Sequence, residues 1–269
     1  MQNGTAAKYR NLIRHIRNWP VYFAAKLKNR FEEVSFVTRG NHLKFRVPTH
    51  ALYLVFKEIF LTDFYNIDAL LRKLPQRPVV VDIGANAGYF NLLLFSRLSE
   101  ATVYAYEPIQ ANYALFGEHI SINPLLAKHV HLFHKAVTGT PHDEVELYME
   151  TNSENSVIAS VFNDFDSQNH FTQKVPAISL SQILEENKIE RADLVKIDCE
   201  GSEYPILYET PRDCWEKMPF LTIEVHDLDA DRRNVGALSE FLKTHGYEVI
   251  SVPTHSNCHT VEASRKRNQ

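Results

Sequence analysis

The sequence predicts an α/β protein built on a mostly parallel β-sheet. From residue 78 onward, short β-branched and apolar runs alternate with segments of helical periodicity, and this alternation is typical of βαβ units with parallel strands. The chain has 269 residues, 44% of them hydrophobic, which is enough to bury a substantial core without disulfides. We therefore expect one α/β domain over residues 76–269, preceded by an N-terminal extension over residues 1–75.

The N-terminal extension is expected to contain a basic arm, a hairpin and a helix. Residues 1–31 hold seven basic residues and no acidic one, and Pro20 must kink or split the helical arm expected at 8–31. We favour packing of the arm's apolar side on the main domain, with peripheral contact to an anionic membrane as the alternative. Alternating residues predict a hairpin at 34–47, and apolar periodicity predicts a helix at 50–73.

The main domain is expected to contain about seven strands. Apolar runs predict strands at 79–84, 102–108, 129–137, 192–198, 220–226 and 246–252, with a final antiparallel strand at 258–264. Helical periodicity predicts helices at 89–99, 110–122, 179–187, 203–209 and 233–245. A polar and acidic insertion at about 138–174 interrupts the alternation, and within it 144–149 and 156–162 alternate like hairpin strands.

Composition excludes several classes of protein. No apolar run reaches the length of about 18 residues that a membrane-spanning helix needs, and we find no secretory signal. Three cysteines without a C-x-x-C pair suit a reducing compartment, so we expect a cytoplasmic protein. Outside the basic arm, 22 basic and 33 acidic residues remain, and this negative charge argues against a nucleic-acid partner.

The segment after the first strand of the main domain predicts a cofactor site. Gly84 ends the strand where the chain must turn, and Gly88 stands at the entry to the next helix. Glu107, at the end of the second strand, can accept hydrogen bonds from both ribose hydroxyls. Asp82 would repel a pyrophosphate but suits the ammonium group of a methionine moiety. The segment therefore favours S-adenosylmethionine over NAD, whose G-x-G-x-x-G pattern is missing.

Four segments resemble the FkbM family of S-adenosylmethionine-dependent methyltransferases: VDIGANAGYF, YAYEP, LVKIDCEGSEYPIL and TIEVH. The resemblance runs from about residue 58 to 247 and implies a class I methyltransferase fold, a Rossmann-like, seven-stranded, mostly parallel sheet whose last strand is reversed. It also implies O-methylation of a hydroxyl on a small molecule, sugar, glycan or glycolipid, with S-adenosylhomocysteine as the product. By position, it implies these cofactor-binding residues: Asp82, Gly84, Asn86, Gly88, Tyr89, Phe90, Glu107, Pro108, Asn112, Ala136, Val137 and Asp198.

Methylation of an aliphatic hydroxyl is helped by a base that removes its proton. Glu224 and His226 alternate along one strand and so point to the same side. His226 titrates near neutral pH and is our preferred base. Asp198, at the end of the neighbouring strand, is the second candidate, and Glu200 is the third. Lys196 is expected to pair with a carboxylate such as Glu58 or Glu224.

No metal site is predicted, although magnesium between Asp198 and Glu224 stays open. His129, His131 and His134 do not share one face of a strand. The acidic loop at 227–231 lacks the glycine of a calcium loop and is expected to cap the helix that follows. Cys199 is expected to be a buried small residue, because no basic partner that would lower its pKa is evident.

The acceptor is expected to be a small molecule or a saccharide. Its contacts should come from segments outside the cofactor-binding core: 40–66, 226–233 and the insertion at 150–174, with Asn152, Ser153, Asn155, Ser156 and Asn163. Two other functions stay open. One is an NAD-linked sugar oxidoreductase, and the other is a non-catalytic family member that binds cofactor or glycan.

Overall fold

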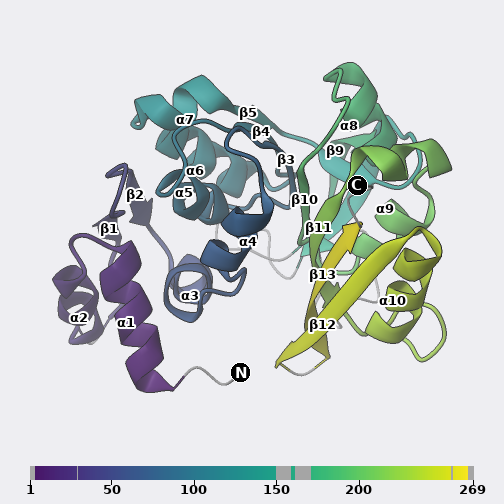
Figure 1. Ribbon diagram of the computed structural model, residues 1–269. Coiled ribbons are helices and arrows are strands. Elements are labelled where there is room, and N and C mark those ends of the chain that lie inside the picture. The colour runs from purple at the N-terminus through teal and green to yellow at the C-terminus, as the bar shows by residue number, and fades with distance from the viewer. Residues whose placement is uncertain (1–3, 29, 150–158, 161–170, 256, 266–269) are drawn as a thin grey trace.

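The main sheet of the computed structural model has seven strands (Figure 1). The structure describes residues 4–28, 30–149, 159–160, 171–255 and 257–265. In spatial order the strands are β12 (Tyr247–His255), β13 (Cys258–Arg265), β11 (Phe220–His226), β10 (Leu194–Ile197), β3 (Val79–Ile83), β4 (Thr102–Tyr106) and β5 (Val130–Phe133). β13 lies between β11 and β12 and runs antiparallel to both, whereas the other neighbouring pairs are parallel. The predicted class I methyltransferase topology is thus confirmed.

Helices cover both faces of the main sheet (Figure 1). One face carries α5 (Tyr89–Phe95), α6 (Gln110–Ser121) and α7 (Pro124–His129), and the other carries α8 (Leu180–Glu186), α9 (Glu203–Tyr208), α10 (Val235–Thr244) and the 3-10 helix η2 (Arg212–Lys217). Val80 packs in the core on the first side and Val81 in the core on the second. Strands buried on both faces read as continuous apolar runs, which is why they stand out in the sequence.

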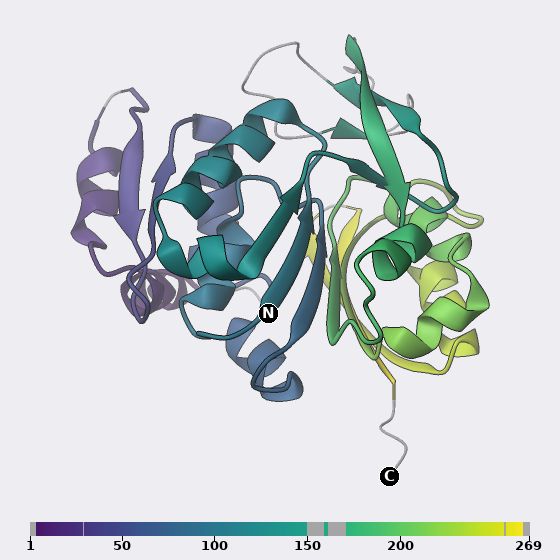
Figure 2. The ribbon, with the colours of Figure 1, turned by 90° about the horizontal axis from the view of Figure 1, so that it is seen from above.

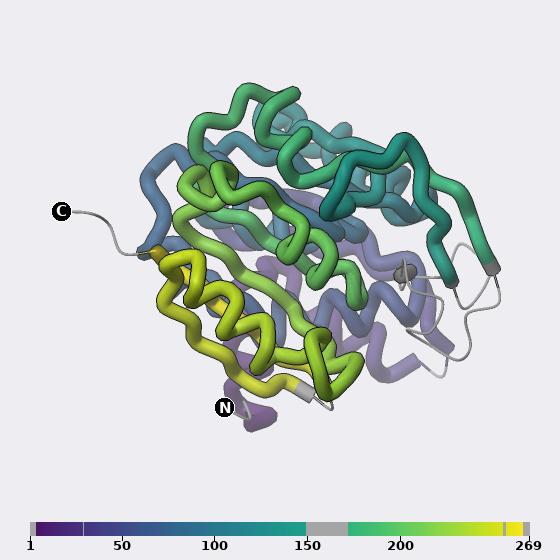
Figure 3. The backbone as a smooth tube through the Cα atoms, turned by 90° about the vertical axis from the view of Figure 1, so that its right-hand side faces the viewer, coloured from purple at the N-terminus to yellow at the C-terminus, as the bar shows by residue number. Residues whose placement is uncertain are grey.

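Most of the predicted elements are present, with shifted ends. α5 ends at Phe95 rather than at residue 99, and the sequence analysis did not predict α7 or η2. The C-terminal hairpin of β12 and β13 is present as predicted, and α10 packs along it (Figure 3).

The basic arm is split at Pro20, as the sequence predicts, into α1 (Thr5–His15) and α2 (Pro20–Lys26). Leu12, Ile16 and Tyr22 are buried in the same apolar core as the central helices, so the favoured packing interpretation is confirmed. Contact of the arm with an anionic membrane stays a prediction. Within the described residues, no helix has both the length and the apolar character needed to cross a membrane.

The extension continues with an antiparallel hairpin of β1 (Val34–Val37) and β2 (Lys44–Val47), as predicted. The single helix expected at 50–73 is wrong: the chain forms α3 (His50–Lys57), a π-helical turn η1 (Glu58–Thr62) and α4 (Ile67–Lys73). Asp63 and Asn66 lie between the last two with positive φ values of 52° and 45°. Asp63 Oδ1 accepts a hydrogen bond from the N–H of Ile67 at 2.9 Å. Short polar side chains of this kind favour turns over a continuous helix.

The insertion forms a second sheet beside the main one (Figure 2). Its spatial order is β6 (Ala136–Thr138), β9 (Phe171–Ser179), β7 (Glu144–Met149) and β8 (Ala159–Ser160). The strand expected at 129–137 is therefore two strands in different sheets, because β5 pairs with β4 only as far as Phe133 and β6 pairs with β9. The loop expected before residue 174 is in its last part the strand β9.

Candidate active site

The loop between β3 and α5, residues 84–88, turns sharply at the carboxyl edge of the main sheet. Gly84 has a φ of 75°, and a Cβ atom there would lie 1.8 Å from the backbone oxygen of Asp198. Gly88 has a φ of 77°, and a Cβ atom there would lie 2.2 Å from the ring of Phe116. Only glycine combines this conformation with such close approach. The two glycines that the sequence analysis singled out are therefore required by the geometry of the loop.

Glu107 holds this loop from the end of β4. Its Oε2 atom accepts a hydrogen bond from the N–H of Asn86 at 2.7 Å, and its Oε1 atom accepts one from the N–H of Ile109 at 2.8 Å. Burial raises the pKa of Glu107 to about 7, against the effect of these donors and of Asn112. Each carboxylate oxygen has two lone pairs, so these bonds leave acceptor capacity for ribose hydroxyls.

The other predicted cofactor residues surround this loop, and most of their side chains are buried. Tyr89 donates a hydrogen bond from its hydroxyl to the backbone oxygen of Arg46 at 3.0 Å, and the ring of Phe90 packs against Tyr65. Both side chains thus face the core between α5 and the extension. Those of Asn112, Ala136 and Val137 are also buried, and the backbone oxygen of Pro108 contacts the ring of His134.

Lys196 connects the cofactor loop to the next strand. Its ammonium group is buried 2.6 Å from the backbone oxygen of Gly84, 3.1 Å from Asp82 Oδ1 and 3.3 Å from Asp198 Oδ2. Burial would lower the pKa of Lys196, but the two carboxylates raise it above its usual value. The expected partners, Glu58 and Glu224, are wrong. The parallel register places Lys196 beside Asp82 on the same face, which the sequence alone could not show.

Asp82 lies beneath the cofactor loop. Its side chain is fully buried, and Oδ2 accepts a hydrogen bond from the side chain of Asn91 at 2.6 Å. The carboxylate therefore holds Lys196 in place below the loop. Direct contact between Asp82 and a cofactor ammonium stays a prediction.

Asp198 is the partly exposed partner of Lys196, at the end of β10. Tyr65 donates a hydrogen bond from its hydroxyl to Asp198 Oδ2 at 2.8 Å. Burial acts to raise the pKa of Asp198, but Lys196 and Tyr65 lower it below its usual value. Asp198 is therefore an ionised carboxylate next to the cofactor loop. Tyr65 was not identified as a site residue from the sequence, because it lies in the unexpected break before α4.

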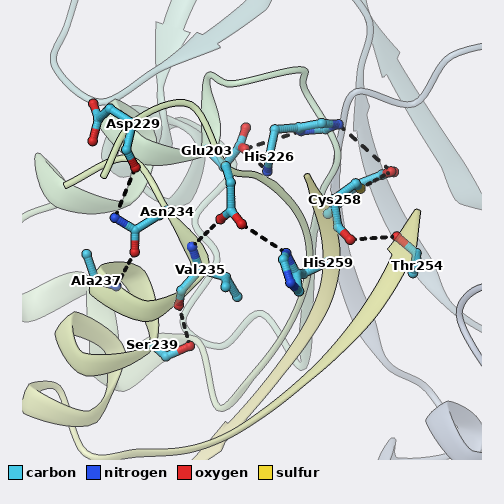
Figure 4. A network of polar contacts seen from close by, with 12 residues as sticks. Glu203, His226, Asp229, Asn234, Val235, Ala237, Ser239, Thr254, Cys258 and His259 are labelled. Carbon is cyan, nitrogen blue, oxygen red and sulfur yellow. Dashed lines mark hydrogen bonds and ion pairs between the residues drawn. The ribbon is translucent and has the colours of Figure 1, made fainter. Parts of the chain in front are cut away.

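A second group of ionisable side chains surrounds His226 at the end of β11 (Figure 4). His226 Nε2 lies 3.2 Å from Glu200 Oε2 and 3.9 Å from Glu224 Oε1. On the other side of the ring, Nδ1 lies 3.4 Å from Glu203 Oε1. Cys258, directly opposite His226 on β13, donates from its thiol to Glu224 Oε1 at 3.0 Å. The sequence analysis did not identify Cys258, because only strand pairing brings it to this place.

These contacts disfavour His226 as the base. Burial would lower the pKa of the imidazole, but hydrogen bonds with Cys258 and Glu203 and the charge of Glu200 raise it to about 11. An imidazolium has no lone pair with which to accept a proton. Asp198 and Glu200 are thus better placed as proton acceptors than His226.

Glu200 and Glu58 complete the acidic side of the site. Burial raises the pKa of each to about 7. The charge of Asp198 acts in the same direction on both, whereas His226 opposes it. Segment 40–66 therefore supplies Tyr65 and Glu58 to this region. The insertion residues Asn152, Ser153, Asn155, Ser156 and Asn163 lie outside the described residues.

Two expectations about structural roles also have an outcome. Asp229 Oδ1 accepts hydrogen bonds from the N–H groups of Asp231, Arg232 and Arg233. Asp227 Oδ1 accepts one from the first residue of α10. The acidic loop is thus a cap for α10, as predicted. Cys199 is partly exposed rather than buried, and burial together with nearby acids raises the pKa of its thiol.

The sheet order and the loop at its carboxyl edge place this chain in the class of α/β methyltransferases. A family model, the methyltransferase FkbM domain, matches residues 82–249, and the chain belongs to this family.

Two curated relatives and one solved structure are similar to the chain. Methyltransferase sdnD of Sordaria araneosa is 26% identical over 69% of this chain and 79% of its own length. The AMB antimetabolite synthetase AmbE of Pseudomonas aeruginosa is 26% identical over 72% of this chain, which spans only 10% of AmbE. A methyltransferase FkbM structure from Methylobacillus flagellatus is 13% identical with a TM-score of 0.47, covering 70% of this chain and 44% of that one.

Proposed function

We propose that the protein is an S-adenosylmethionine-dependent O-methyltransferase that acts on a hydroxyl of a small molecule, sugar or glycan. One observation carries the proposal: Lys196 joins the cofactor loop at Gly84 to the ionised Asp198. The chain therefore presents a cofactor-type loop and a proton acceptor at one edge of the sheet. Membership of the FkbM family supports methyl transfer as the reaction.

On the cofactor side, the chain would hold the nucleoside through Glu107 and the loop. Glu107 lies at the strand end where an acid accepts ribose hydroxyls in related sheet architectures. The left-handed turns at Gly84, Asn86 and Gly88 bring backbone close to the ligand. S-adenosylmethionine supplies an activated methyl group on a sulfonium. Holding the acceptor in line with that methyl group can account for much of the rate enhancement.

On the acceptor side, Asp198 and Glu200 would take the hydroxyl proton. Asp198 comes first, because Lys196 and Tyr65 orient its carboxylate and keep it ionised beside the loop. Glu200 is the second acceptor, 3.2 Å from the imidazole of His226. Carboxylates are acceptors only when ionised and so suit a substrate that donates hydroxyl hydrogens. A saccharide acceptor fits this arrangement.

Calorimetric titration tests the cofactor. S-adenosylmethionine and S-adenosylhomocysteine should bind the wild-type protein, and Glu107→Ala should weaken binding at least about tenfold, the equivalent of one lost hydrogen-bonded contact. Glu100→Ala, at an exposed residue, is the matched control and should bind like the wild type. Binding of NAD in place of these ligands would support the oxidoreductase and overturn the proposal.

Single-turnover assays with a panel of saccharides and small hydroxylated molecules test catalysis. We expect methylation of an oxygen, with a lowered kcat and retained cofactor affinity in Asp198→Asn. Cofactor binding without transfer to any member of the panel would favour the non-catalytic alternative. Transfer to nitrogen or carbon would contradict the assignment of O-methylation.

A further inference from the structure

The chain places a thiol, an imidazole and a carboxylate at one point of the acceptor side. The ligand atoms of Glu224, His226 and Cys258 all lie within 4.8 Å of one another, and this is the one such group of three found among the described residues. We propose that these three side chains form a binding site for a divalent transition-metal ion of the zinc type. The existence of the site does not depend on the proposed function, whereas its role in activating the acceptor does.

The sheet itself assembles this group. Glu224 and His226 alternate along β11 and so share one face, and Cys258 is the antiparallel partner of His226 on β13. Cys258 Sγ lies 3.0 Å from Glu224 Oε1, which lies 3.9 Å from His226 Nε2. Ligand atoms in a tetrahedral zinc site lie about 3.3–3.6 Å apart, as follows from metal–ligand distances of about 2.0–2.3 Å. Small side-chain movements would therefore suffice to enclose an ion.

The donor set discriminates among ions. Thiolate, imidazole nitrogen and carboxylate oxygen are zinc ligands, whereas magnesium and calcium take oxygen ligands. Three protein ligands leave a fourth position open, as in catalytic rather than structural zinc sites. The open position would lie toward Glu200 and Asp198, the two residues proposed to accept a proton.

A buried carboxylate orients the imidazole as in known metal sites. Glu203 is fully buried, and its Oε1 atom accepts a hydrogen bond from the backbone N–H of His226 at 2.9 Å and lies 3.4 Å from Nδ1. Figure 4 shows Glu203 and His226 turned toward one another. Metal-bound histidines commonly donate their other ring nitrogen to a carboxylate in this way. The contact with Glu203 leaves Nε2, on the side of Glu224, as the ligand atom.

Such an ion would also explain the accumulation of acids here. Glu58, Glu200 and Glu224 lie around one point with Asp198, and burial raises the pKa of the first three. A divalent cation would compensate their charge. It would also hold an acceptor hydroxyl at the open position and favour loss of its proton. Glu200, 3.2 Å from His226 Nε2, is placed to receive that proton.

Cobalt substitution of the full-length protein tests the site directly. After chelation and dialysis, addition of Co²⁺ should give a near-ultraviolet band for charge transfer from thiolate to cobalt, at one ion per chain. Cys258→Ser should abolish the band, whereas the matched variant Cys214→Ser, at a buried cysteine in η2, should retain it. Absence of the band in the wild type, or an equal band in Cys258→Ser, would overturn the proposal.

Competition with a chromophoric chelator for Zn²⁺ gives a second, independent measurement. His226→Gln and Glu203→Gln should each weaken zinc binding, the latter about 10–100-fold as for other outer-shell partners. Unchanged zinc affinity in a folded His226→Gln variant would contradict the site. Calorimetry with S-adenosylmethionine on the same samples separates the two proposals: cofactor binding without zinc binding refutes only the metal site, and the reverse refutes only the proposed function.

Discussion

The two halves of the sheet's carboxyl edge are built from different materials. On the β3–β4 side, backbone groups dominate: Glu107 binds backbone N–H groups, and Gly84 lets the loop touch the next strand. On the β10–β11–β13 side, side chains contact side chains, with His226 among acids and Cys258. The comparison teaches that the cofactor half is preorganised by backbone geometry. The acceptor half depends on how its charges are balanced.

The largest expected effect breaks the backbone-built half. In Gly84→Ala the added Cβ would lie 1.8 Å from a backbone oxygen in a residue with φ of 75°. Overpacking and left-handed strain together should lower the free energy of unfolding by on the order of 4–6 kcal/mol. Denaturant unfolding measures this loss. In the matched variant Gly117→Ala, where nothing lies within 4 Å, stability should rise by about 0.5–1 kcal/mol, and an equal loss in both variants would contradict the explanation.

The next effect concerns the residue that joins the two halves. Lys196→Met leaves the buried Asp82 and its neighbour Asp198 without their common cation. Removing one partner of a buried ion pair costs about 3–5 kcal/mol. Thermal and denaturant unfolding should show this loss. Lys243→Met, at an exposed pair with Glu240, should change stability by less than about 1 kcal/mol, and a similarly small change at Lys196 would show that the buried pair is dispensable.

Acidification should loosen the contact between the cofactor loop and the extension. His119 donates from Nδ1 to the backbone oxygen of Ala87 at 2.9 Å, and its Nε2 atom accepts from the N–H of Arg46 at 3.1 Å. Burial lowers the pKa of His119 to about 4. The unfolded ring binds a proton below about pH 6.5 and the folded ring does not. Stability is therefore complete above pH 6.5 and falls as the pH drops toward 4, by about 3 kcal/mol.

The unfolding free energy at about pH 7.5 and about pH 5 measures this effect. The wild type should lose about 2 kcal/mol more than His119→Gln over that interval, because the variant has no ring to protonate. Identical pH dependence of the two proteins would contradict the assignment. His15, whose pKa burial and Arg97 also lower to about 4, remains in both proteins and contributes equally.

The smallest expected effect sharpens the comparison within the cofactor half. Glu107→Gln replaces one of two acceptor oxygens by a donor that faces a backbone N–H. A buried donor left without a partner costs about 1–3 kcal/mol. Glu200→Gln, on the acceptor side, should cost less, because its carboxylate is partly exposed. A larger loss in Glu200→Gln, measured by denaturant unfolding, would reverse the comparison.

The cofactor half was predictable because its signals are local. Gly84, Gly88 and Glu107 follow strands whose apolar runs are unmistakable, and a left-handed turn restricts residue type at its own position. The acceptor half was only partly predictable. Asp198 and His226 stand at strand ends, but the partner of Lys196 and the protonation of His226 depend on neighbours far away in the sequence.

The sequence by itself determined the alternation of strands and helices, the parallel core and the glycine-dependent loop, since these follow from local periodicity and local backbone restriction. Only the tertiary structure decided that residues 129–137 divide between two sheets and that the helix expected at 50–73 breaks to deliver Tyr65. It also decided that Cys258 meets Glu224 beside His226. The physical reason is that strand register and long-range burial, which set these contacts and pKa values, arise from pairings that no short window of sequence contains.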